Sequence, residues 1–255
     1  MTLLFRKLGA LLVGIGGSIS LSLMHRFPIP WVFFLIFGLL ILLIIGMSFL
    51  LGRRSHEVLD NLPLSLTTAL ACVGLFTLMD WRLWRFLLII LIGVLLSLLF
   101  GWEVYRETHE SAQKPFRRMK MMLWVFNGYA LITTMFAFTL FFPRIPFWVL
   151  LLVAAVVVSF ISSQIWRMYY AISWQRLLPW VLLVSMLMIE CMWAVHLLPF
   201  GYLVSGFLAT WMWYLVQLFI RFHFGPQGVI WEKQWRFLLA NAVCFVAVLY
   251  LAQWV

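Results

Sequence analysis

This sequence has few charged residues: only 10% of its 255 residues are Asp, Glu, Lys or Arg, and only eight residues in all are acidic. A soluble globular domain is about one quarter charged and about half apolar. Here 65% of the residues are hydrophobic, and the mean hydropathy is +1.07. A chain with so little polar surface cannot cover its own core in water. The composition therefore argues against a soluble protein and predicts an integral membrane protein.

Residues that would build a familiar active site are also scarce. The three cysteines, Cys72, Cys191 and Cys244, are far apart and have no metal or redox spacing. The two aspartates, Asp60 and Asp80, are too few for a two-metal phosphoryl-transfer site. No P-loop, dinucleotide fingerprint, nucleophile elbow or paired-histidine metal motif is present in the sequence. We expect no enzyme of a familiar class, no cofactor and no metal.

A net charge of +10 is compatible with nucleic-acid binding, so the positions of the basic residues have to be considered. The basic residues lie in short runs between apolar segments, which is typical of contact with anionic lipid headgroups. The sequence contains no zinc pattern or RNA-binding signature, so no nucleic-acid partner is expected.

Nine apolar segments predict an all-α fold, a polytopic transmembrane helix bundle. Strands are excluded because no alternating barrel pattern exists and an open strand edge cannot be satisfied in hydrocarbon. The first segment follows Arg6 and Lys7 as in a signal peptide, but without a clear cleavage site, so we predict an uncleaved span. The predicted spans are Leu8–Leu23, Trp31–Leu51, Leu62–Met79, Leu83–Gly101, Met121–Phe142, Phe147–Tyr169, Leu177–Leu198, Tyr202–Phe222 and Phe237–Val255. They make four hairpins and one closing helix.

Orientation follows from the distribution of Lys and Arg between alternate loops, because cytoplasmic loops carry the excess. Fourteen of the 18 basic residues fall on one side and four on the other, namely Arg26, Arg82, Arg85 and Arg144. The sequence therefore predicts a cytoplasmic N-terminus, an external C-terminus and a multi-pass protein of the plasma (inner) membrane.

A single transmembrane domain over 1–255 is expected, with a hint of internal duplication. Phe27-Pro28-Ile29-Pro30-Trp31 resembles Phe142-Pro143-Arg144-Ile145-Pro146-Phe147-Trp148, and each segment forms the outer tip of the first hairpin in a four-helix set. The pattern suggests parallel four-helix repeats over 1–101 and 115–222. The alternative is that proline and aromatic residues simply recur where helices meet the membrane interface.

Glu190 is the only acidic residue deep inside a predicted span. An acid at the helix centre costs roughly 2.5–3.5 kcal/mol on insertion scales, so we expect it to face the bundle or a wet cavity. It serves either as a proton or cation site or as a neutral carboxyl that hydrogen-bonds a neighbouring helix. By depth, Thr133, Thr134 and Thr210 are its expected partners.

Four amides form a second pattern, each about one to two turns, roughly 6–9 Å, from the cytoplasmic end of a different span. They are Asn127, Gln164, Gln217 and Asn241. Equal depth predicts a polar layer in the inner leaflet, which Thr67 and Thr68 are positioned to join. The layer either lines a vestibule or binds a polar substrate, or its amides only link helices, at about 0.6 kcal/mol each.

Two further segments predict contacts. Ala10, Gly14, Ser18 and Ser22 recur at every fourth position of the first span, and such a stripe lets two helices approach closely, either within this chain or between subunits. The segment from Glu103 to Lys120 predicts a helical extension of the fourth span that Pro115 breaks. Its basic residues either contact anionic headgroups, at about 1 kcal/mol each, or reflect ordinary cytoplasmic charge bias. They are Lys114, Arg117, Arg118 and Lys120.

The C-terminal third carries Leu198-Pro199-Phe200-Gly201-Tyr202, then Arg221 with His223, and an aromatic ending at Trp254. In these features it resembles a group of uncharacterised multi-spanning membrane proteins from small-genome bacteria. The resemblance implies a bacterial origin and carries neither an activity nor residue roles.

Three functions fit these patterns. The leading hypothesis is a small transporter or channel-like bundle whose path runs past Glu190 and the amide layer. The alternative is a structural or assembly subunit of a membrane complex, whose polar residues lock helices and whose Trp-rich surface meets partners or lipid. The third is a membrane-embedded, lipid-modifying enzyme that uses the basic inner face.

Overall fold

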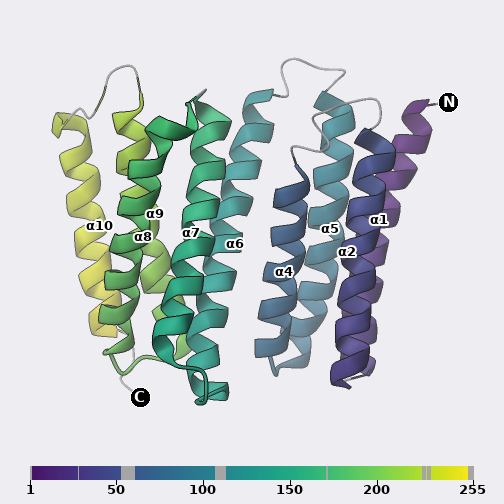
Figure 1. Ribbon diagram of the computed structural model, residues 1–255, viewed down its shortest axis with the longest axis horizontal. Helices are drawn as coiled ribbons and strands as arrows, with labels where there is room; N and C mark the ends of the chain where they lie inside the picture. Colours follow the sequence, from purple (N-terminus) through teal and green to yellow (C-terminus); the bar gives the residue numbers. More distant parts are fainter. Residues whose placement is uncertain are drawn as a thin grey trace. The chain divides into compact units, whose positions relative to one another are not determined.

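The computed structural model describes residues 2–27, 29–52, 61–106, 113–170, 172–225, 228 and 231–251. These residues form nine α-helices and no strand (Figure 1). The predicted all-helical fold class is therefore confirmed for the described part of the chain.

The helices follow one another along the chain. The first four are α1 (Thr2–Arg26), α2 (Pro30–Gly52), α4 (Leu62–Leu78) and α5 (Arg82–Arg106). The other five are α6 (Gln113–Phe141), α7 (Phe147–Tyr169), α8 (Trp174–His196), α9 (Tyr202–His223) and α10 (Trp231–Leu251).

Seven of these helices are long and apolar enough to cross a membrane. Two apolar stretches in the described residues are shorter, Leu62–Leu78 of α4 and Gln234–Tyr250 of α10. The chain is thus a multi-pass helical membrane protein, with seven long candidate spans and two short ones.

The start of α6 corrects one prediction. Pro115 does not break a helix; it lies in the first turn of α6, which begins at Gln113. A proline is tolerated there because the first turn has no intrahelical partner for its backbone N–H groups. The predicted extension of the fourth span is present, since α5 continues to Arg106. At the other end of the chain, α10 begins at Trp231, ahead of the predicted Phe237, and residues 252–255 lie outside the described residues.

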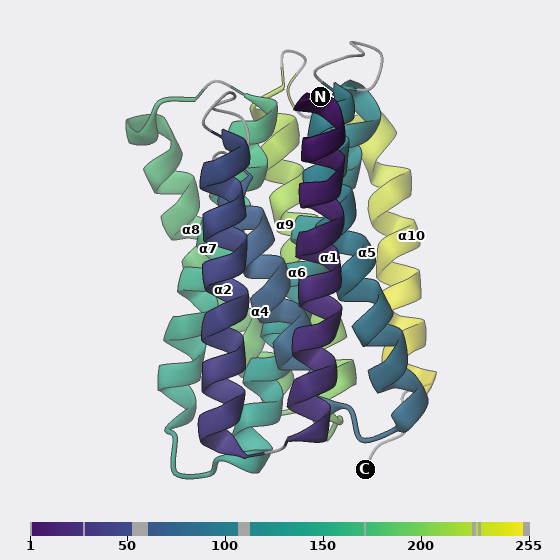
Figure 2. The same ribbon diagram turned by 90° about the vertical axis from the view of Figure 1, so that its right-hand side faces the viewer.

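The chain divides into two compact units, Met1–Asn127 and Gly128–Val255. In the first unit, α1 packs against both α2 and α5, and α4 also contacts both of them (Figure 2). α1 and α4 also contact each other, so the four helices form a small bundle in which each contacts at least two others.

Small residues bring α1 and α5 together. A Cβ atom added to Gly14 would lie 1.8 Å from Ser97 Oγ and 2.5 Å from the carbonyl oxygen of Gly93. One added to Gly93 would lie 2.2 Å from Ser18 Oγ, and the Ser18 hydroxyl donates to the Ile89 carbonyl oxygen at 2.8 Å. The predicted stripe thus packs within the chain, against α5, although its last member Ser22 is exposed.

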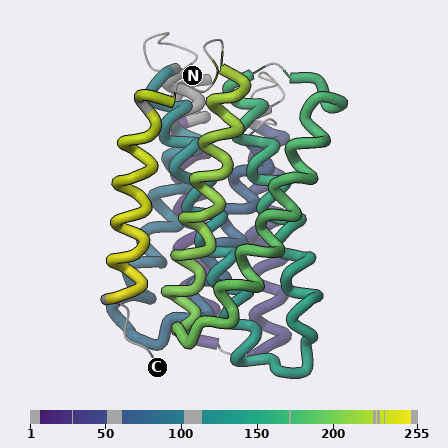
Figure 3. Tube along the Cα trace, turned by 90° about the vertical axis from the view of Figure 1, so that its left-hand side faces the viewer, coloured from purple at the N-terminus to yellow at the C-terminus, as the bar shows by residue number. Residues whose placement is uncertain are grey.

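In the second unit, α8 contacts both α7 and α9 (Figure 3). Glycine again marks the closest approach: a Cβ atom on Gly206 of α9 would lie 2.1 Å from Thr133 Oγ1 and 2.8 Å from Thr133 Cα on α6. Trp213 fills the space beside Gly128, and its indole N–H donates to Ser162 Oγ of α7 at 2.9 Å. Trp213 therefore ties α9 to both α6 and α7.

Candidate functional site

Asn127 is the amide with the clearest contacts. Its side chain is fully buried, and its Nδ2 group donates to Thr68 Oγ1 at 3.0 Å and Thr67 Oγ1 at 3.2 Å. Both threonine hydroxyls donate in turn to carbonyls of α4, that of Thr68 to Leu64 at 2.7 Å. The structure thus brings together three of the predicted polar residues in a link between α6 and α4.

The other three amides lie in the second unit and have separate surroundings. Asn241 of α10 accepts a hydrogen bond from the Trp211 indole of α9 at 3.0 Å and donates to the Phe237 carbonyl at 2.8 Å. Gln217 is 97% buried, and its Oε1 has no hydrogen-bond partner among the described residues. Gln164 is half-buried. Each amide is placed on a different helix, as predicted; a shared layer stays a prediction.

Glu190 is exposed on α8, so it does not face the packed interior of the second unit. The alternative expectation, that it faces a wet cavity, stays a prediction. The buried face of this helix is taken by Val184, Met188, Met192 and Val195. Glu190 is two residues from Met188 and from Met192, which at 3.6 residues per turn places it on the opposite side.

The expected partners of Glu190 make other contacts. Thr134 and Thr210 are buried and donate to carbonyls of their own helices, Ala130 and Gly206, each at 2.7 Å. Thr133 Oγ1 is buried against Gly206 and has no hydrogen-bond partner among the described residues. These three threonines therefore serve the packing of α6 and α9.

Around Glu190 the exposed face of α8 is apolar. Leu182, Met186, Trp193 and Leu197 are each 57–64% exposed, one to two turns before or after the carboxylate. The acid is therefore the one charged group in an exposed apolar stripe on this helix, between Leu182 and Leu197.

The four basic residues of the predicted lipid contact all lie on the first turns of α6. Lys114, Arg117 and Arg118 are exposed, and Lys120 Nζ lies 4.3 Å from the centre of the buried Phe116 ring. Because α6 begins at Gln113, these four basic residues belong to the same helix as the apolar segment that follows them.

One cluster was missed from the sequence. Arg85 of α5 contacts Asp80 at 3.4 Å and His25 Nδ1 of α1 at 3.4 Å, and its Nε–H donates to the Met79 carbonyl oxygen at the end of α4. Its guanidinium lies 5.9 Å from the Phe76 ring centre, beside a pocket of about 240 Å³. His25 and Asp80 lie in or beside two predicted outer turns, and Arg85 lies at the start of the predicted span Leu83–Gly101. Their shared position on the predicted outer side was the signal that the sequence offered. The arrangement fastens the ends of α1, α4 and α5.

No three metal-ligating side chains gather within the described residues. Comparison with known proteins finds no matching protein-family model, no matching curated protein and no matching solved structure, so the bacterial resemblance of the C-terminal third stays a prediction.

Proposed function

We propose that this protein is a polytopic subunit that binds another integral membrane protein through the exposed face of α8. The observation that carries this proposal is the position of Glu190, alone among exposed apolar side chains. In lipid, an acid at this depth costs roughly 2.5–3.5 kcal/mol. That cost falls when a partner helix covers the face and donates a hydrogen bond to the carboxyl group. The partner is therefore a membrane helix with a hydroxyl, amide or basic side chain at the same depth.

The positions of the polar side chains favour the binding of a partner protein over a transport path through the bundle. Asn127, Thr134, Thr210 and Asn241 make hydrogen bonds that link helices or close within them. Glu190 lies opposite the buried face of its helix, whereas a path through the bundle needs polar groups directed inward. The assembly hypothesis accounts for the hydrogen-bonded polar groups inside the protein and for Glu190 on the exposed face of α8.

The proposed membrane topology has nine crossings, a cytoplasmic N-terminus and an external C-terminus, in the plasma (inner) membrane of a bacterium. It is supported by the 14 to 4 distribution of basic residues between alternate loops. It requires α4 and α10 to cross, although their apolar stretches are short. A helix of 17 residues, such as α4, rises about 25 Å, near the lower limit for a span.

We further propose that the four helices α1 to α5 and the four helices α6 to α9 are parallel repeats, as their matching proline turns predict. A contact found at equivalent positions in the two sets of helices supports the repeat. Ser18 precedes Phe27 by nine residues, and Thr133 precedes Phe142 by nine. Each of these hydroxyl residues meets a glycine of the fourth helix in its own set, Gly93 and Gly206 respectively.

The assembly function is tested by two substitutions of Glu190. Glu190→Gln keeps the size and a hydrogen-bond acceptor, so the complex should persist. Glu190→Leu removes the acceptor and should weaken association by about tenfold, the value of one interhelical hydrogen bond in a membrane. Since no described residue bonds Glu190, neither change should impair folding. The measurement is the mass of the particle extracted from native membranes in mild detergent.

Val156→Ala is the matched control, because Val156 of α7 is 69% exposed and lies on a different helix. A particle that contains only this chain, or a complex that survives Glu190→Leu unchanged, contradicts the assembly function. An intact complex with loss of cellular function in Glu190→Gln supports the transport hypothesis instead, because only a proton or cation site needs the titratable group.

A further inference from the structure

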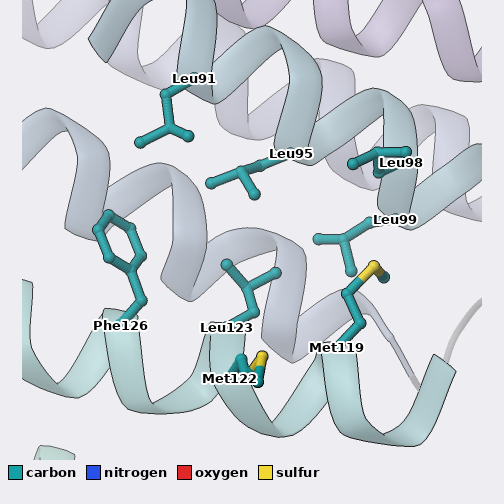
Figure 4. A pocket seen from close by; sticks show the side chains of 8 residues that line it. All are labelled: Leu91, Leu95, Leu98, Leu99, Met119, Met122, Leu123 and Phe126. Atoms are coloured by element: carbon teal, nitrogen blue, oxygen red, sulfur yellow. The ribbon is translucent and has the colours of Figure 1, made fainter. Parts of the chain in front are cut away.

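An apolar pocket of about 230 Å³ lies between α5 and the first half of α6 (Figure 4). Four leucines of α5 between Leu91 and Leu99 line one side, and Met119, Met122, Leu123 and Phe126 of α6 line the other. In Figure 4 the leucines of α5 lie on one side of the space between the two helices, and Leu123 and Phe126 extend toward it from α6. The residues that line it are aliphatic, thioether or aromatic, so the pocket fits a hydrocarbon chain.

The pocket has a buried floor and an exposed rim. Leu99 and Leu123 are 1% and 6% exposed, whereas Leu98 and Met122 are 41% and 72% exposed. An occupant can therefore enter sideways from the surface of the helices, which in a membrane is the lipid.

Basic side chains continue the pocket toward the start of α6. Lys114, Arg118, Met122 and Phe126 follow one another at intervals of four residues, so consecutive members are neighbours on the helix surface. Lys114 and Arg118 are exposed. Side chains on a helix lean toward its N-terminus, and long basic side chains extend their charge toward the membrane surface. Two positive groups thus stand at the end of an apolar pocket, within one to two turns of its rim.

We propose that this pocket binds one anionic phospholipid, with an acyl chain between α5 and α6 and its phosphate against Lys114 and Arg118. The apolar lining suits the chain, and the adjacent charge suits the headgroup. A neutral lipid would fill the pocket without using the two cations, and a free phosphate would leave the pocket unfilled. The inference rests on the proposed membrane placement of the chain and is independent of the Glu190 face.

The test uses the full chain in nanodiscs of phosphatidylcholine that contain a minor fraction of phosphatidylglycerol, with lipids counted after release by native mass spectrometry. The parent should retain one phosphatidylglycerol per chain. The double variant Lys114→Gln and Arg118→Gln should weaken that binding by about thirtyfold, from two basic contacts. The variant Leu95→Trp, which fills the pocket, should lose bound lipid of both classes.

Matched controls separate the site from bulk effects. The double variant Arg167→Gln and Arg176→Gln removes the same charge from exposed residues of the second unit, and Leu152→Trp enlarges an exposed residue of α7. Both should retain phosphatidylglycerol as the parent does. A thermal unfolding curve in the same nanodiscs shows whether each variant is folded, and a pocket variant that fails to fold is replaced by Leu95→Phe.

Equal retention of phosphatidylglycerol by the parent and the Lys114/Arg118 variant overturns the headgroup contact, and equal retention by the folded pocket-filling variant overturns the acyl-chain site. Displacement of the lipid by millimolar inorganic phosphate alone likewise contradicts the proposal, because a phosphate has no chain for the pocket. These outcomes do not depend on Glu190, so failure here leaves the assembly function standing.

Discussion

Asn127 of α6 is hydrogen-bonded to α4 within the first unit. Its Nδ2 group reaches both threonine hydroxyls of α4, and each hydroxyl uses its own hydrogen on a carbonyl one turn back. Because the amide is fully buried, removing it leaves two hydroxyl acceptors without their donor in a site that excludes water. This contact is therefore a polar link between α4 and α6.

We expect Asn127→Ala to lower the free energy of unfolding by about 1 kcal/mol, within the range of interhelical hydrogen bonds in membranes. In a double-mutant cycle, Asn127→Ala and Thr68→Val should couple by more than about 0.5 kcal/mol. Thr134→Val is the control, since the Thr134 hydroxyl bonds only its own helix, at Ala130. The free energy of unfolding of each single and double variant is measured by reversible unfolding in mixed micelles. Additivity between Asn127 and Thr68 contradicts the contact.

At the scale of helix pairs, glycines determine where two backbones meet. The cost of adding a methyl group depends on which atom it meets. At Gly206 the nearest atoms include Thr133 Cα at 2.8 Å, a backbone atom that no rotamer change can move. At Gly46 of α2, an added Cβ meets nothing within 4 Å.

Gly206→Ala should therefore destabilise the protein by about 1–3 kcal/mol, the usual cost of overpacking. Gly46→Ala should be neutral or stabilising by up to about 1 kcal/mol, because alanine favours a helix over glycine. The comparison is made by thermal unfolding of both variants under the same conditions. A Gly206→Ala protein as stable as the Gly46→Ala protein is incompatible with a close approach of α6 and α9.

The sequence predicted where the helices lie better than which way they face. Hydropathy locates apolar stretches, and the nine predicted spans each correspond to a helix. In α8, however, apolar residues lie on every side, so periodicity does not show which face is buried. The depth of Glu190 was available from the sequence, whereas its orientation depends on the contacts of Val184, Met188 and Met192.

Some of the site was predictable for a physical reason and some was not. Equal depth in two spans that start on the same predicted side of the membrane anticipated the contact of Asn127 with Thr67 and Thr68, since residues at one level can meet. The role of Pro115 was mispredicted, because the sequence alone does not show whether a proline ends one helix or begins the next. The apolar pocket depends on side chains from both α5 and α6, and the register between these two helices cannot be read from the sequence.

For the whole molecule, the decisive question is whether α4 and α10 cross the membrane. Seven helices are long apolar candidates, and the two remaining stretches are short. With nine crossings the segment after α5 is cytoplasmic. If α4 and α10 lie at the surface, only three crossings precede that segment and it is external. The location of the C-terminus does not distinguish the two topologies, because nine and seven crossings both leave it outside.

The most direct measurement is therefore the location of a dual reporter, a periplasmic phosphatase joined to a cytoplasmic fluorescent protein, fused after Ser111. A fusion after Gly52 serves as the control, since it is cytoplasmic in both topologies. Nine crossings predict fluorescence and no phosphatase activity at Ser111. Phosphatase activity without fluorescence there would mean that α4 does not cross the membrane, and it would contradict the nine-span architecture.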